Sequence, residues 1–98
     1  MSKRRKRLPA RGLPTVVRVI VSEQDMRDGE RRCCRSCPIA LALSRSIGEP
    51  AEVLDGAAHL VNHNATYILP RSAKAYIRRF DEGRTRYDAP RWFVARLF

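Results

Sequence analysis

The sequence predicts an α+β fold, a two-layer sandwich in which a mixed or antiparallel sheet of four to five strands carries two helices on one face. Several short segments are rich in β-branched residues or alternate between apolar and polar residues, which is typical of strands. Two longer segments repeat apolar residues at helical spacing. The 98 residues, 44% of them hydrophobic, suffice for one ordinary domain with its own core. The predicted order along the chain is β-α-β-β-β-α-β.

Basic residues are concentrated at the N-terminus. The chain has 20 Lys and Arg against 10 Asp and Glu, a formal net charge of +10. Residues 1–14 hold no acidic side chain, and their prolines and Gly12 interrupt regular structure. Their basic residues are Lys3, Arg4, Arg5, Lys6, Arg7 and Arg11. We therefore expect a disordered basic tail over residues 1–14 and a single folded domain over residues 15–98.

The first folded segment, residues 15–22, is predicted to be a strand because β-branched residues dominate it. Both of its faces are largely apolar, so we expect it inside the sheet, paired with the last strand near the centre. Ser22 and Asp25 then have the spacing of a capping box, which predicts a single helical turn that ends by Gly29. A polar loop over residues 28–36 follows.

The next segment is predicted to be a helix that begins at Cys37 and stops at Gly48. Pro38 would occupy the first helical position, where the missing N–H costs nothing. Glycine is the residue that most often follows the end of a helix. The apolar face of this helix would consist of Ile39, Ala40, Leu43 and Ile47.

Three short strands are predicted next, over residues 51–55, 57–61 and 65–69. They are separated by Asp55-Gly56 and by the Asn-His-Asn sequence of residues 62–64, residue types that accept the backbone of tight turns. We therefore expect the three strands to be antiparallel neighbours.

From Pro70 the apolar period changes to that of a helix, which Gly83 closes. Its apolar face would consist of Ala73, Tyr76, Ile77 and Phe80. The opposite face would carry Arg71, Lys74 and Arg78. A turn-prone basic linker over residues 84–90 leads to a final strand over residues 92–98.

Four segments carry a resemblance to a known family. They are residues 20–25 with Gly29 after them, residues 34–43 (Cys-Arg-Ser-Cys-Pro-Ile-Ala-Leu-Ala-Leu), residues 67–70 and residues 77–83. In these segments the chain resembles a family of small proteins of uncharacterised activity that bacteriophages and prophages encode. The resemblance implies a phage or bacterial cytosolic setting and implies no catalytic activity.

The three cysteines lie within residues 33–37, which excludes a disulfide framework spread over the fold and favours a reducing, cytoplasmic location. Cys34 and Cys37 form a Cys-x-x-Cys unit, whose spacing lets two thiolates bind one zinc ion, and His59 and His63 would complete four ligands. The same thiols would alternatively form a redox pair, because the helix N-terminus favours a thiolate at Cys37. Cys37 with either histidine is a weaker candidate for nucleophilic catalysis, since no orienting acid is recognisable. The structural alternative, a helix cap packed among apolar residues, is the one that we favour.

Basic and aromatic residues also accumulate in the last third of the chain. Basic groups neutralise phosphates and aromatic rings stack on unpaired bases, so this composition is compatible with nucleic-acid binding. The candidate basic residues are Arg71, Lys74, Arg78, Arg84, Arg86 and Arg91. Tyr87 and Trp92 are the aromatic candidates for an exposed surface, because Tyr76 and Phe80 fall on an apolar helix face. The alternative is that the charged residues on this helix face contact only solvent and bind no ligand.

We therefore expect a non-enzymatic, phage-type accessory protein that binds DNA or RNA non-specifically through the N-terminal arm and the basic C-terminal surface. The alternative is a protein-interaction module that docks on an acidic host or defence protein, with zinc as a stabilising ion. No stretch approaches the roughly 18 apolar residues that a membrane-spanning helix needs, so no membrane partner is expected.

Overall fold

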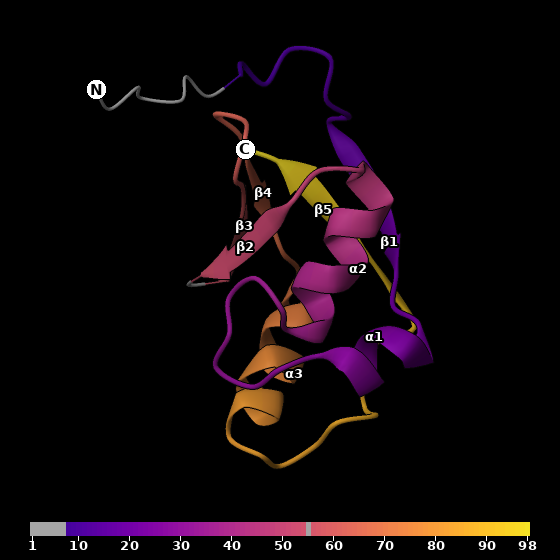
Figure 1. Ribbon diagram of the computed structural model, residues 1–98. Coiled ribbons are helices and arrows are strands. Elements are labelled where there is room, and N and C mark those ends of the chain that lie inside the picture. The colour runs from indigo at the N-terminus through magenta and orange to yellow at the C-terminus, as the bar shows by residue number, and fades with distance from the viewer. Residues whose placement is uncertain (1–7, 55) are drawn as a thin grey trace, which may run out of the picture.

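Five strands form one antiparallel sheet in the computed structural model, which describes residues 8–54 and 56–98 (Figure 1). In chain order the elements are β1 (Val16–Ile20), α1 (Glu23–Asp28), α2 (Pro38–Ile47), β2 (Ala51–Leu54), β3 (Ala57–Leu60), β4 (Thr66–Ile68), α3 (Arg71–Asp81) and β5 (Trp92–Leu97). Across the sheet the strands follow the order β1-β5-β4-β3-β2. The predicted α+β class and element order are confirmed, with the short turn after the first strand forming α1.

The first strand lies at an edge of the sheet and not inside it, so the predicted central position was wrong. β1 does pair with β5 as expected, with Val17 opposite Ala95 and Val19 opposite Phe93. Val17 and Val19 are buried, whereas Val16 is 49% exposed on the other face. Apolar residues on both faces of a strand do not require that both faces are covered, because much of any protein surface is apolar.

The helix ends follow the predicted local signals. The Ser22 hydroxyl accepts a hydrogen bond from the Asp25 N–H at 3.1 Å, and the Asp25 carboxylate accepts one from the Ser22 N–H at 2.8 Å. This capping box satisfies two N–H groups that the helix itself leaves without partners. Pro38 is the first residue of α2, and Gly48 ends that helix with a φ of 80°, a conformation that favours glycine.

The core lies between the sheet and the helices. Ile39 and Leu43 of α2 are fully buried, and α2 contacts both β1 and β2. Tyr76 and Phe80 of α3 are also fully buried, with their ring centroids 5.7 Å apart, as the helical spacing predicted. In Figure 1, α2 lies in front of the sheet while α1 and α3 gather at its lower end. No helix in the described part of the chain is long and apolar enough to span a membrane.

The described part of the predicted tail, residues 8–14, is attached to the sheet. The Leu8 N–H donates to the Asn62 carbonyl oxygen at 2.9 Å, and the Asn64 N–H donates to the Leu8 carbonyl oxygen at 2.6 Å. The Tyr67 hydroxyl donates to the Pro14 carbonyl oxygen at 2.6 Å. This differs from the expected boundary at residue 14, because the turn after β3 offers backbone groups that pair with Leu8. Residues 1–7 lie outside the described residues.

Candidate functional site

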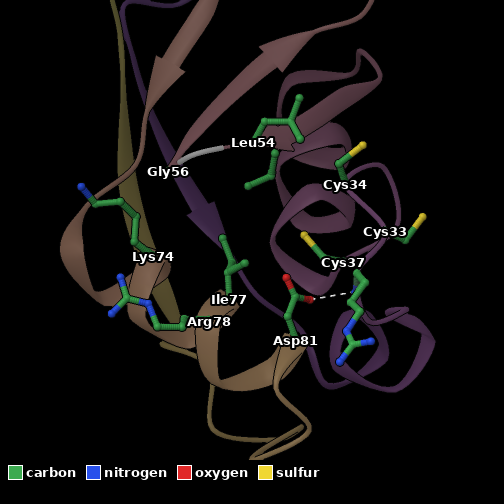
Figure 2. A pocket seen from close by; sticks show the side chains of 11 residues that line it. Cys33, Cys34, Cys37, Leu54, Gly56, Lys74, Ile77, Arg78 and Asp81 are labelled. Carbon is green, nitrogen blue, oxygen red and sulfur yellow. Dashed lines mark hydrogen bonds between the residues drawn. The ribbon is translucent and has the colours of Figure 1, made fainter.

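A cleft of about 460 Å³ lies between α3, the loop that precedes α2 and the end of β2 (Figure 2). It is lined by Arg32, Cys33, Cys34, Cys37, Val53, Leu54, Gly56, Lys74, Ile77, Arg78 and Asp81. The sequence predicted the cysteines and the basic residues of the last helix as two separate candidate sites. The fold brings the three cysteines to one cleft with two of those basic residues, Lys74 and Arg78.

The loop that carries the cysteines is held in place on two sides. The Cys34 carbonyl oxygen accepts a hydrogen bond from the Val53 N–H at 2.8 Å, so the loop runs beside the edge of β2. On the other side, the Arg32 N–H donates to the Asp81 carboxylate of α3 at 2.9 Å, the dashed line in Figure 2. Arg32 has a φ of 58°, a left-handed conformation that costs about 1–2 kcal/mol in a residue with a Cβ atom. The hydrogen bond to Asp81 helps to offset that cost.

Cys37 acts as the N-cap of α2. Its side chain is buried, and its Sγ accepts a hydrogen bond from the Ala40 N–H at 3.4 Å. Burial raises the pKa of the Cys37 thiol to about 11, more than the hydrogen bonds at the helix N-terminus lower it. The redox and nucleophilic alternatives both need a thiolate at this position, and burial disfavours one. The geometry agrees with the structural interpretation.

The four predicted zinc ligands, Cys34, Cys37, His59 and His63, do not converge. Among the described residues, no group of three His, Cys, Asp or Glu side chains is placed to hold a metal ion. Cys37 is buried beside the core, and Figure 2 shows that its sulfur and that of Cys34 point in different directions. The His59 Nδ1 lies 3.0 Å from the Thr66 hydroxyl, and His63 is buried at the turn that follows β3. Among the described residues, the cysteine pair and the two histidines therefore do not form the four-ligand site that the sequence spacing suggested.

Three of the predicted nucleic-acid contacts, Arg71, Lys74 and Arg78, lie together on the exposed side of α3. Residues three or four apart occupy adjacent turns of one helix face, so these cations are neighbours. No Asp or Glu side chain in the described part of the chain lies within 4.0 Å of them as an ion-pair partner. Lys74 and Arg78 also line the cleft, and the Lys74 side chain packs over Gly56. These three residues are termed the α3 basic face.

The remaining predicted contacts have different surroundings. Arg86 is a structural residue, because its Nη1 lies 2.9–3.3 Å from three carbonyl oxygens at the C-terminal end of α1. Its guanidinium also lies 5.2 Å from the centroid of the Phe80 ring. Arg84 is exposed and lies 3.5 Å from the Glu82 carboxylate, and Arg91 is exposed. The sequence could not distinguish the structural role of Arg86 from the exposed positions of Arg84 and Arg91, because the residues that Arg86 contacts lie almost 60 positions away in the chain.

The predicted N-terminal arm lies mostly outside the described residues. Arg11 is exposed. It belongs to the segment that precedes β1, which lies at the opposite end of the sheet from α3 in Figure 1. The arm residues that the structure does not describe are Lys3, Arg4, Arg5, Lys6 and Arg7.

Two exposed arginines that were not among the predicted contacts lie on the face of the sheet that the helices leave uncovered. Arg18 lies in the middle of β1 between Val16 and Ile20 on that face, and Arg96 lies diagonally across from it on β5, opposite Val16. The signal was present in the sequence, because a charged residue in the middle of an apolar strand face indicates that this face meets solvent or a ligand.

No family model, curated protein or solved structure matches the chain. The geometry of the two basic surfaces and of the cleft is therefore the basis for assigning a function.

Proposed function

We propose that this protein binds nucleic acid through phosphate contacts made by the α3 basic face. The observation that carries the proposal is three exposed cations on adjacent helical turns, without an acidic partner within ion-pair distance in the described part of the chain. Exposed Lys and Arg side chains neutralise phosphates and release the counterions bound to them. Because phosphate contacts carry no base information, the binding would have low sequence selectivity.

The cleft beside the α3 basic face supports the same ligand. Among the described residues, its lining includes the cations Arg32, Lys74 and Arg78 and one carboxylate, that of Asp81. That carboxylate already accepts the Arg32 N–H, so part of its capacity as an acceptor is used within the protein. An excess of positive charge in a hollow raises the local concentration of anions. A sugar-phosphate backbone that follows α3 would thus meet cations along the border of the cleft.

The resemblance to bacteriophage and prophage proteins extends the proposal to a phage-encoded accessory protein in the bacterial cytosol. In that setting the excess of basic residues, which gives the chain a pI near 10.8, suits a polyanionic partner. The basic residues of the N-terminal arm would add phosphate contacts at other positions on the same strand.

A salt titration of binding to labelled DNA and RNA of mixed sequence tests the proposal. Replacing Arg71, Lys74 and Arg78 together by alanine should reduce the slope of log affinity against log salt by about two to three, at about 0.9 per phosphate contact on duplex DNA. The single variant Arg78→Ala should reduce the slope by about one.

The matched control is Arg27→Ala, because Arg27 is exposed in the last turn of α1 and has no ion pair in the described part of the chain. This variant should retain the slope of the wild type. A triple variant with an unchanged slope would contradict the proposal. Absence of wild-type binding at 50 mM salt would also overturn it and would favour the acidic protein partner.

A further inference from the structure

The face of the sheet opposite the helices carries exposed apolar and aromatic side chains on adjacent strands. Ile20 is 60% exposed, Trp92 51% and Ile68 42%. The register places Ile20 directly opposite Trp92, and Arg96 opposite both Val16 and Ile68. Exposed apolar side chains that adjoin on one face can mark an interaction surface, whereas single scattered ones are normal. The uncovered sheet face is defined here as Val16, Arg18, Ile20, Ile68, Trp92 and Arg96.

The charge on the uncovered sheet face is positive. The Arg18 guanidinium lies 4.6 Å from the centroid of the Trp92 ring, and neither Arg18 nor Arg96 has an acidic ion-pair partner in the described part of the chain. Strand alternation places one carboxylate on this side of the described strands, that of Glu52 on β2, which is at the far edge of the sheet. Arg35 neutralises it at 3.0 Å.

The positive charge and the exposed apolar residues of the uncovered sheet face favour one of two binding partners, a second copy of this chain or single-stranded nucleic acid. A symmetric contact between two copies would bury unpaired arginines against another positively charged face, and an unpaired buried charge is costly. Single-stranded nucleic acid offers the complementary set of groups, because its bases present flat apolar faces and its phosphates are regularly spaced anions. In a duplex the faces of the bases are already stacked on one another, so a flat aromatic surface selects unpaired strands.

We propose that the uncovered sheet face binds single-stranded nucleic acid, with Trp92 stacking on a base and Arg18 and Arg96 contacting phosphates. This inference rests on the proposed function and adds to the α3 basic face a second surface that binds unpaired strands but not duplexes. Arg91, exposed and directly before Trp92, adds a cation at the end of β5 from which the chain leads back to α3. The sheet thus supplies base contacts that the α3 basic face does not.

Fluorescence provides a direct test, because Trp92 is the single tryptophan of the chain. Titration with an oligothymidine or oligouridine of about fifteen nucleotides should quench the fluorescence of Trp92, whereas a mixed-sequence duplex of equal length should not. Trp92→Ala should lower affinity for both oligonucleotides by about 5- to 150-fold, the effect of losing one stacked base. Its duplex affinity and salt slope should remain those of the wild type. Trp92→Phe, which retains a ring, should recover most of the lost affinity.

Tyr87→Ala is the matched control, since Tyr87 is 59% exposed but lies in the linker after α3 and not on the sheet. Circular dichroism should show the same melting temperature for the variants of Trp92 and Tyr87. The triple variant of the α3 basic face should weaken single-stranded and duplex binding alike. Duplex binding therefore tests the α3 basic face, and the loss of single-stranded binding in Trp92→Ala tests the sheet face.

The stacking proposal is overturned if Trp92→Ala and Tyr87→Ala lose affinity equally, or if bound oligonucleotide leaves the fluorescence unchanged. Either result would leave the proposed role of the α3 basic face in phosphate binding unaffected. Sedimentation that shows a dimer with Trp92 shielded in the absence of nucleic acid would also overturn it, by assigning the face to a second copy.

Discussion

Replacing Arg86 by alanine should lower the free energy of unfolding by about 2–5 kcal/mol. Its Nη1 lies 2.9 Å from the carbonyl oxygen of Met26, 3.3 Å from that of Arg27 and 3.1 Å from that of Gly29. These carbonyls lie at the C-terminal end of α1, where a helix leaves its acceptors without partners. A hydrogen bond from a charged donor contributes about 1.5–3 kcal/mol. The contact with the Phe80 ring, at 5.2 Å from its centroid, adds about 0.5–2 kcal/mol.

Arg84 offers a matched control in the same loop. It pairs with Glu82 at 3.5 Å, and both side chains are at least half exposed, so this pair contributes at most about 1 kcal/mol. Thermal unfolding followed by circular dichroism should place Arg86→Ala at least about 8 °C below the wild type, since 1 kcal/mol corresponds to about 4–8 °C in a domain of this size. Arg84→Ala should lose no more than about 8 °C, the most that 1 kcal/mol corresponds to, and should melt above Arg86→Ala.

Two results would refute the structural role of Arg86. The first is an equal melting temperature for the Arg86→Ala and Arg84→Ala variants. The second is a loss of nucleic-acid affinity in folded Arg86→Ala protein that exceeds the loss in Arg84→Ala, because the guanidinium would then be a ligand contact as the sequence predicted.

Two further predictions follow from the buried Asp25 and Cys37. Desolvation raises the pKa of the Asp25 carboxyl, but hydrogen bonds from Arg45 and from the helix cap outweigh it and leave that pKa below its usual value. Its stabilising contribution is therefore present above about pH 4 and is lost as the pH falls through the folded-state pKa. Asp25→Asn should lower stability at neutral pH and flatten the acid side of the pH profile in urea unfolding; an unchanged profile would contradict this. Because burial raises the pKa of Cys37 to about 11, a thiol reagent at pH 8 should modify Cys33 and Cys34 in the native protein and all three cysteines in denaturant. Rapid native modification of Cys37 would count against its role as a buried cap.

The candidate site could be predicted from the sequence only where its geometry is local. Arg71, Lys74 and Arg78 share an exposed face because one helix contains all three, and helical spacing alone sets that arrangement. The zinc site failed for the opposite reason. The Cys-x-x-Cys spacing did not determine the side-chain directions, and the sulfurs of Cys34 and Cys37 point apart. The two histidines belong to other segments, and no group of three potential ligands forms in the described part of the chain.

The sequence by itself determined the elements and their ends. The helix ends depend on neighbours within about one helical turn, so the sequence alone predicts them. Examples are the capping box of Ser22 and Asp25, Pro38 at the start of α2 and Gly48 after it. Only the tertiary structure decided that β1 is an edge strand and that one face of the sheet is left open. Alternation along a strand separates its side chains into two faces, but it does not say which face a distant helix will cover. That choice depends on how α2 packs against β1 and on the pairing of β1 with β5, about 75 residues later in the chain.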